Sequence, residues 1–158
     1  MPRDIRGQLS AEGRRFAVIV SRFNESITSK LLAGAEAELR KLGCRDSDIT
    51  RVSVPGAFEL PAAAGRAVRT GKFDAVIGLG CVLRGETSHY ELVAGEAAQG
   101  LGWVGRHADI PVAFGVLTCE TNEQALERAG GKEGNKGAEA ARAAVDMISV
   151  YEQLTRIV

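Results

Sequence analysis

The segment 79–91 holds the residues best suited to chemistry. It contains one of the chain's two histidines, together with an arginine, glycines and hydroxyl side chains: Arg84, Gly85, Thr87, Ser88 and His89. A histidine ordinarily titrates close to neutral pH, so it can accept or donate a proton during a reaction. A glycine- and hydroxyl-containing turn that opens a helix can bind a phosphate through backbone N–H groups. The segment therefore predicts proton transfer beside an anion-binding loop.

A lone histidine in the first turn of a helix is more often a capping or surface residue. The neighbours of His89 favour a functional role, whereas His107 has no such neighbours and is interpreted as a surface residue. Arg128, Lys132 and Lys136 are cations suited to phosphate, but each is a solvated side chain unless the fold brings it to the site.

Aromatic and polar residues also follow the other predicted strands. Phe23 stands beside Asn24 in a polar stretch, Phe58 lies within Gly56–Glu59, and Phe114 lies in the last strand, ahead of Cys119. From the residue alone, Phe23 is equally compatible with stacking on a heterocycle and with folding back over the core. For Phe58 a core anchor is the favoured interpretation. Because parallel strands end at one edge of a sheet, these segments are expected to meet there.

Hydrophobic patterning predicts the elements that position these residues. Apolar runs predict strands over 16–20, 75–80 and 111–118, and the alternating, β-branched stretch 49–54 predicts a further strand. Helical spacing predicts helices over 27–42, 62–68, from 87 or 88 to 101, 121–130 and 138–154. The patterns Ser88-x-x-Glu91 and Thr121-x-x-Gln124 predict capping boxes, and residues 132–137 are expected to form a loop. Residues 1–14 show no periodicity and are expected to be a loose arm or an edge strand added to a neighbour.

Strands and helices therefore alternate along the chain. This order indicates an α/β fold with a parallel sheet covered by helices on both faces. With 158 residues and neither repeats nor a low-complexity linker, residues 1–158 are expected to form one domain with a substantial hydrophobic core.

Composition argues against several classes of protein. Twenty basic and twenty acidic residues give zero net charge, so neither nucleic acid nor a membrane surface is an expected partner. The first eleven residues lack the apolar core of a signal peptide, and no apolar run reaches membrane-spanning length. Three widely spaced cysteines indicate free thiols in a reducing cytoplasm. Walker A, dinucleotide-binding and metal-ligand patterns are absent from the sequence. We therefore expect a metal-free, cofactor-free site for condensation or elimination on a phosphorylated small molecule.

Four motifs resemble one family closely. They are Ser21-Arg-Phe-Asn24, Val54-Pro-Gly-Ala-Phe-Glu-Leu-Pro61, Gly80-Cys-Val-Leu-Arg-Gly-Glu-Thr-Ser-His89, and Gln124-Ala-Leu-Glu-Arg-Ala-Gly130 with Gly134-Asn-Lys-Gly137. In this order, from about Gly7 to Leu154, they resemble the lumazine synthase (6,7-dimethyl-8-ribityllumazine synthase) family. The resemblance implies a flavodoxin-like three-layer α/β/α sandwich with a four-stranded parallel sheet. It also implies condensation of 5-amino-6-(D-ribitylamino)uracil with 3,4-dihydroxy-2-butanone 4-phosphate in riboflavin biosynthesis.

The same resemblance implies a homopentamer whose active sites lie between subunits. The short stretch 130–137 is similar to that of members in which twelve pentamers form a 60-subunit shell. By position, His89 is implied to carry protons, and Phe23 to stack on the pyrimidine. Ala57, Phe58 and Glu59 are implied to bind the ribityl chain, and Cys81, Val82 and Leu83 the pyrimidine edge. The phosphate is implied to bind Gly85, Glu86, Thr87 and Arg128. Across the subunit interface, Phe114 is implied to close over the heterocycle and Lys136 to reach the ring or its ribityl chain. Glu139 is implied to orient Arg128 or His89.

The sequence departs from the commoner pattern of the family at Cys81, Glu86, Ser88 and Tyr90, and altered substrate affinity is the expected effect. Two other functions stay open at this point. One is a binding or shell-forming protein without turnover, which would not need His89, Phe23, Arg128 and Lys136 together. The other is a flavodoxin-like electron carrier, which would need a richer phosphate loop and an acidic balance.

Overall fold

The computed structural model describes residues 1–158 and contains one four-stranded parallel sheet. The strands are β1 (Phe16–Ser21), β2 (Ile49–Val54), β3 (Ala75–Leu83) and β4 (Val112–Cys119), in the order β2-β1-β3-β4. Residue Phe16 of β1 stands opposite Ile49 and Ala75 of its two neighbours. All four strands thus end at one edge, as the alternation of elements predicts.

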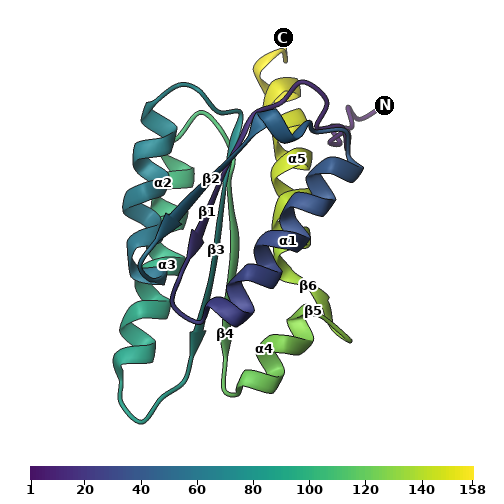
Figure 1. The fold of residues 1–158 in the computed structure, drawn as a ribbon. Coiled ribbons are helices and arrows are strands. Elements are labelled where there is room, and N and C mark those ends of the chain that lie inside the picture. Colours follow the sequence, from purple (N-terminus) through teal and green to yellow (C-terminus); the bar gives the residue numbers. More distant parts are fainter.

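Helices cover both faces of the sheet, which makes the three layers visible in Figure 1. α2 (Leu60–Arg69) and α3 (His89–Arg106) lie on one face, and α1 (Glu25–Lys41) and α5 (Lys136–Thr155) on the other. The short helix α4 (Asn122–Arg128) follows β4, and two 3-10 turns, η1 (Asp46–Asp48) and η2 (Ala57–Glu59), precede β2 and α2. The α/β three-layer architecture is confirmed. None of the helices combines the length and apolar composition that crossing a membrane requires.

The core lies on both sides of the sheet because the side chains of each strand alternate between its faces. In β1, Phe16 and Val18 pack towards α1 and α5, whereas Ala17 and Ile19 pack towards α2 and α3. Helices α2 and α3 pack closely on this second face. A Cβ atom added at Gly100 would lie 2.5 Å from the Cγ atom of Pro61. This close packing accounts for the small residues of α2.

The capping predictions have different outcomes. Thr121 caps α4 as predicted, because its hydroxyl accepts from the Gln124 N–H at 3.2 Å and its own N–H donates to Gln124 Oε1. The box at Ser88 is wrong. Ser88 already has helical φ and ψ angles and makes no side-chain capping bond. The hydroxyl of the preceding Thr87 accepts from the His89 N–H instead, at 3.4 Å.

The stretch 132–137 is not a plain loop. β5 (Ala129–Gly131) and β6 (Gly134–Asn135) form a small antiparallel hairpin. Asn135 then caps α5, since its side-chain oxygen accepts from the Ala138 N–H at 3.0 Å while its amide donates to the Lys30 carbonyl. This cap starts α5 two residues earlier than the hydrophobic pattern alone predicts.

The strand β3 runs three residues past its predicted end, because β4 continues to pair with it up to Leu83 and Cys119.

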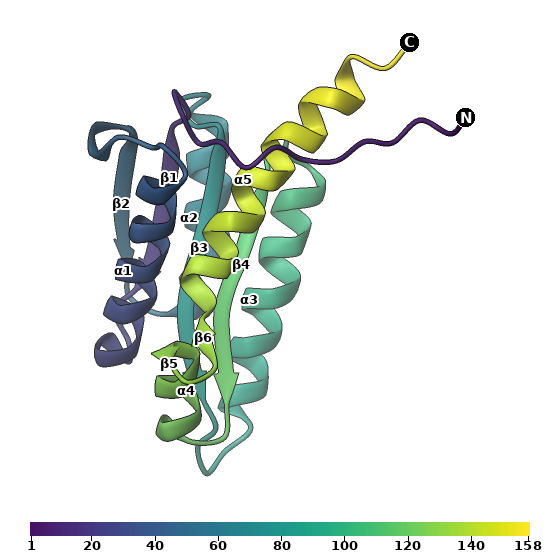
Figure 2. The same cartoon turned by 90° about the vertical axis from the view of Figure 1, so that its right-hand side faces the viewer.

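The N-terminal arm has no regular secondary structure and crosses α5. Gly7 lies against Asp146, and the Gln153 amide donates to the Arg6 carbonyl at 2.7 Å. Figure 2 shows the first residues leading away from the body of the molecule. The arm adds no strand to the sheet of its own chain.

Candidate active site

A cavity of about 760 Å³ opens at the carboxyl edge of the sheet. The turns after β1, β2 and β3 and the first turns of α3 surround it. Its lining includes most of the residues proposed from the sequence: Phe23, Ala57, Phe58, Glu59, Cys81, Val82, Leu83, Gly85, Thr87 and His89. The convergence expected at the ends of parallel strands is therefore present.

The turn that carries Phe23 is held by main-chain and side-chain hydrogen bonds. Its N–H donates to the Pro55 carbonyl at 3.0 Å, and the Asn24 side-chain amide donates to the Cys81 carbonyl, also at 3.0 Å. Asn24 has a left-handed backbone with φ 63°, which asparagine tolerates better than most residues. The Phe23 side chain is 71% exposed, so its ring faces the cavity and does not fold back over the core.

Phe58 corrects the interpretation favoured from the residue alone. Its side chain is 56% exposed and lines the cavity, so it is not a core anchor. The neighbouring Ala57 and Leu60 fill the buried positions of this turn. Glu59 holds the turn by accepting a 2.9 Å hydrogen bond from the Gly56 N–H. The turn η2 thus presents one aromatic ring and one carboxylate to the cavity.

The loop 85–88 has the properties of an anion-binding loop. No acceptor within the chain takes the N–H groups of its four residues. A Cβ atom added at Gly85 would meet nothing within 4 Å, so the space above that residue is open. Glu86 is exposed and does not line the cavity, which keeps its carboxylate away from the site. The free N–H groups and the start of α3 both favour a negatively charged ligand.

Burial makes Cys81 a poor nucleophile. It raises the pKa of the Cys81 thiol to about 12, with a smaller contribution from Cys119. Burial likewise raises the pKa of the Cys119 thiol. All three cysteines are buried and free, as the sequence predicts. At neutral pH the Cys81 side chain is thus a small neutral wall of the cavity.

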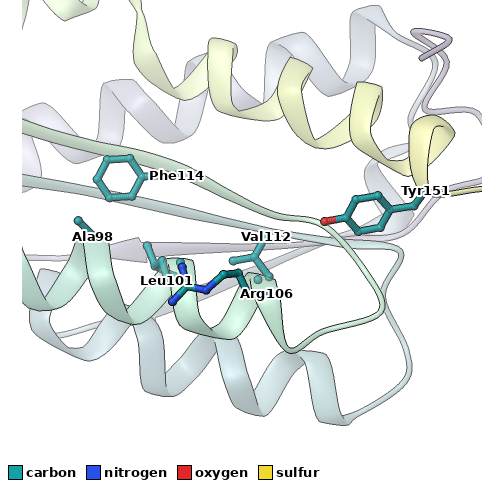
Figure 3. A pocket seen from close by; sticks show the side chains of 8 residues that line it. Ala98, Leu101, Arg106, Val112, Phe114 and Tyr151 are labelled. Carbon is teal, nitrogen blue, oxygen red and sulfur yellow. The ribbon is translucent and has the colours of Figure 1, made fainter. Parts of the chain in front are cut away.

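Besides Glu86, three predicted site residues lie outside this cavity. Arg128, at the end of α4, donates to the Gln124 carbonyl at 3.0 Å and lies 3.7 Å from a Glu127 carboxylate oxygen. Lys136 is the first residue of α5. Phe114 is 39% exposed on the edge strand β4 and lines a second groove of about 420 Å³. Figure 3 shows this groove between α3, β4 and α5, with Ala98, Leu101, Arg106, Val112, Phe114 and Tyr151 around it. A single chain does not bring these three residues to His89.

The cavity also includes residues that the sequence did not single out for the site. They are Pro55, Gly56, Tyr90, Leu92 and Val93. Leu92 and Val93 stand three and four positions after His89, the spacing that places side chains on one face of a helix. Helical spacing from His89 would therefore have predicted that Leu92 and Val93 line the cavity. No group of three or more His, Cys, Asp or Glu side chains lies close enough together to hold a metal ion.

Comparison with known proteins agrees with the motifs. The sequence model of the family described as 6,7-dimethyl-8-ribityllumazine synthase matches residues 13–152. The chain belongs to this family. The 6,7-dimethyl-8-ribityllumazine synthase of Desulfatibacillum aliphaticivorans is 50% identical over 153 residues, which cover 97% of this chain and 99% of the relative. The synthase of Chlorobium phaeobacteroides is 51% identical over 151 residues, 96% of this chain and 97% of the relative. That of Chlorobaculum tepidum is 49% identical over the same lengths. The resemblance seen in four motifs thus extends over nearly the whole chain.

Proposed function

We propose that this chain is a lumazine synthase of riboflavin biosynthesis, acting in the cytoplasm. It condenses 5-amino-6-(D-ribitylamino)uracil with 3,4-dihydroxy-2-butanone 4-phosphate and releases phosphate and water. The observation that carries the proposal is one cavity that joins an exposed aromatic ring, a loop of free N–H groups and His89 in a member of this family.

The pyrimidine and its ribityl chain occupy the part of the cavity between the turns after β1 and β2. Phe23 stacks on the heterocycle, since its ring is exposed and its backbone is held. Cys81, Val82 and Leu83 border the pyrimidine edge at the end of β3. The turn Ala57–Glu59 receives the ribityl hydroxyls through the Glu59 carboxylate and backbone groups.

The phosphate of the second substrate binds the N–H groups of Gly85, Glu86 and Thr87. This places the ketone near His89, the first residue of α3. The pyrimidine amine attacks the ketone carbon, and loss of water gives a Schiff base. Elimination of phosphate follows, and the ribitylamino nitrogen then attacks the remaining carbonyl carbon, so that loss of a second water closes the ring of the lumazine. His89 removes and returns the protons that these steps require.

Assembly supplies the remaining residues. We place Phe114, Lys136 and Arg128 of one subunit at the cavity of the next, in a homopentamer. Support comes from the exposure of Phe114 on an edge strand, from the groove around it, and from the fact that none of the three residues lines the cavity of its own chain. Glu139, three residues after Lys136 on α5, orients Arg128 or His89. The short hairpin 129–135 favours the 60-subunit shell of twelve pentamers over an isolated pentamer.

Turnover by the purified protein tests the proposed function. Mixing it with the two substrates, without metal or cofactor, is expected to produce a fluorescent lumazine and one phosphate per product. A non-catalytic binding protein would bind the pyrimidine and release no phosphate. Absence of both products at high protein concentration would exclude the enzymatic function. Sedimentation velocity of the same sample separates a monomer, a pentamer and a 60-subunit shell.

A further inference from the structure

Arg84, the residue just before the anion-binding loop, has several partners. Its Nε atom lies 3.1 Å from a carboxylate oxygen of Glu120, and its Nη2 atom lies 3.7 Å from Glu91. The guanidinium carbon stands 5.0 Å from the centre of the Tyr90 ring. The Arg84 N–H also donates to the Cys119 carbonyl at 3.0 Å. Arg84 therefore joins the end of β3, the first turn of α3 and the segment that follows β4.

The loop that follows has few other attachments. Residues 85–88 are all exposed, and none of their N–H groups donates within the chain. The internal contact at its far end is the 3.4 Å hydrogen bond from the His89 N–H to the Thr87 hydroxyl. Without Arg84, the loop would be fixed mainly by where β3 ends and α3 begins.

We propose that Arg84 is a positioning residue that holds the phosphate loop, a role that rests on the function proposed above. Glu120 and Glu91 fix the guanidinium, and its face covers Tyr90, a wall of the cavity. The arginine thereby sets the distance between the N–H groups of 85–88 and His89. Small displacements of such groups alter rates and affinities strongly, because binding and reaction depend on near-ideal geometry.

The charges around Arg84 argue against a direct contact with phosphate. Two carboxylates face its guanidinium, and a phosphate placed there would be repelled by both. The interactions are also largely exposed, so they contribute little to global stability. Their effect is expected on the position of the loop and not on the free energy of unfolding.

Four variants test this role: Arg84→Met, Arg84→Lys, Glu120→Gln and the double variant Arg84→Met with Glu120→Gln. Arg84→Met is expected to raise the KM for the phosphorylated substrate on the order of tenfold, with the KM for the pyrimidine within about twofold. Arg84→Lys keeps the positive charge but lacks the planar guanidinium group, so its KM for the phosphorylated substrate is expected to lie between those of the unmodified protein and Arg84→Met. Glu120→Gln is expected to raise the same KM, and the double variant to be no worse than Arg84→Met, because the two residues act as one unit.

Arg45→Met is the matched control. Arg45 is an exposed arginine paired with Asp48 at 3.0 Å, on the turn before β2 and away from the cavity. It is expected to leave both KM values unchanged. Hydrogen exchange of the Arg84, Glu91 and Leu92 N–H groups, which donate within the chain on either side of the loop, adds a readout independent of turnover. Faster exchange of these groups is expected in Arg84→Met and Glu120→Gln.

Distinct results would overturn the proposal. If Glu120→Gln left the KM unchanged or lowered it while Arg84→Met raised it, Arg84 would bind phosphate directly. Equal rises in both KM values with a lower melting temperature would indicate a structural role only. Should Arg84→Met fail to fold, Glu120→Gln and Arg84→Lys still decide the outcome. Failure of the proposed function is separate, because the unmodified protein would then make no lumazine.

Discussion

The side-chain amide of Asn24 donates a 3.0 Å hydrogen bond to the main-chain oxygen of Cys81. This bond joins the turn after β1 to the end of β3, residues that are 57 positions apart in the sequence. Phe23 precedes the first partner, and Val82 and Leu83 follow the second. The bond therefore fixes the aromatic ring relative to the strand end that borders the same cavity.

Asn24→Gly removes this bond while keeping the left-handed backbone that Asn24 adopts. The variant is expected to lose about 1 kcal/mol of stability, the usual contribution of one hydrogen bond. The KM for the pyrimidine should rise more than that for the phosphorylated substrate, because Phe23 is displaced and the loop 85–88 is not. Urea unfolding and steady-state kinetics measure the two effects. Asn122→Gly, at an exposed position on α4, is the control. Equal rises in both KM values would contradict this assignment of Phe23.

His89→Ala is expected to lower kcat by about 10² to 10⁴, the range typical of a general acid–base residue. Substrate KM values should change little, because phosphate binding uses the backbone of the loop. His107→Ala is the control: this histidine stacks on the Trp103 ring at 4.0 Å at the far end of α3, and its Nδ1 atom lies 2.7 Å from the Trp103 carbonyl oxygen. Stopped-flow absorbance of product formation compares the two variants. A kcat for His89→Ala equal to that of the unmodified protein would remove His89 from the mechanism.

Arg128→Ala is expected to raise the KM for the phosphorylated substrate and to leave that for the pyrimidine nearly unchanged.

The Arg128→Ala variant also allows a complementation test of whether two subunits share the site. When His89→Ala and Arg128→Ala subunits are unfolded, mixed equally and reassembled, about one site in four should receive both native residues if adjacent subunits contribute them. The mixture is assayed with the phosphorylated substrate far below the KM of Arg128→Ala, and the expected result is activity above the average of the two separate variants. Activity equal to that average would mean that both residues act within one chain.

Burial of Cys81 predicts how stability depends on pH. The native thiol has a pKa raised to about 12, whereas an unfolded cysteine titrates near ~8.5. Between these values the unfolded chain loses its thiol proton first and so binds fewer protons. The free energy of unfolding therefore falls as pH rises through this window, and the thiol contributes fully only below it.

Cys81→Val removes that contribution at nearly constant volume. Its loss of stability from pH 8 to pH 10.5 is expected to be smaller than that of the unmodified protein. Urea unfolding at several pH values measures the difference. Cys44, whose pKa burial raises to about 11, retains its own alkaline effect in both proteins and so serves as an internal reference. An identical pH profile for the two proteins would contradict the burial of the Cys81 thiol.

Much of the fold follows from the sequence because its signals are local. Continuous apolar runs such as that of β1 are required of a strand buried on both faces, and they predict β1, β3 and β4. The alternating, β-branched stretch 49–54 predicts β2, which lies at the edge of the sheet. Alternation with helices then implies a parallel sheet, and a parallel sheet brings the strand ends together. For this reason the positions of Phe23, Gly85 and His89 around one cavity were predictable before any coordinates.

The missed features depend on partners distant in the sequence. The cap of α5 comes from Asn135, which is held in place by the Lys30 carbonyl more than a hundred residues earlier. At Ser88 the local pattern fits a cap, but the backbone there is already helical and Thr87 makes the contact. The local sequence pattern thus identifies residues that could cap a helix, and tertiary contacts determine which of them does so.

The sequence by itself determined the order of the four sheet strands and the five helices, the family and the residue types at the carboxyl edge of the sheet. Tertiary structure decided how those residues are used. Phe58 is exposed because Ala57 and Leu60 fill the buried positions beside it, and Arg84 is held because Glu120 and Glu91 converge on it from two other segments. The exposure of a side chain and its charged partners depend on which residues surround it in space. Spacing along the chain predicts only those neighbours that are close in sequence.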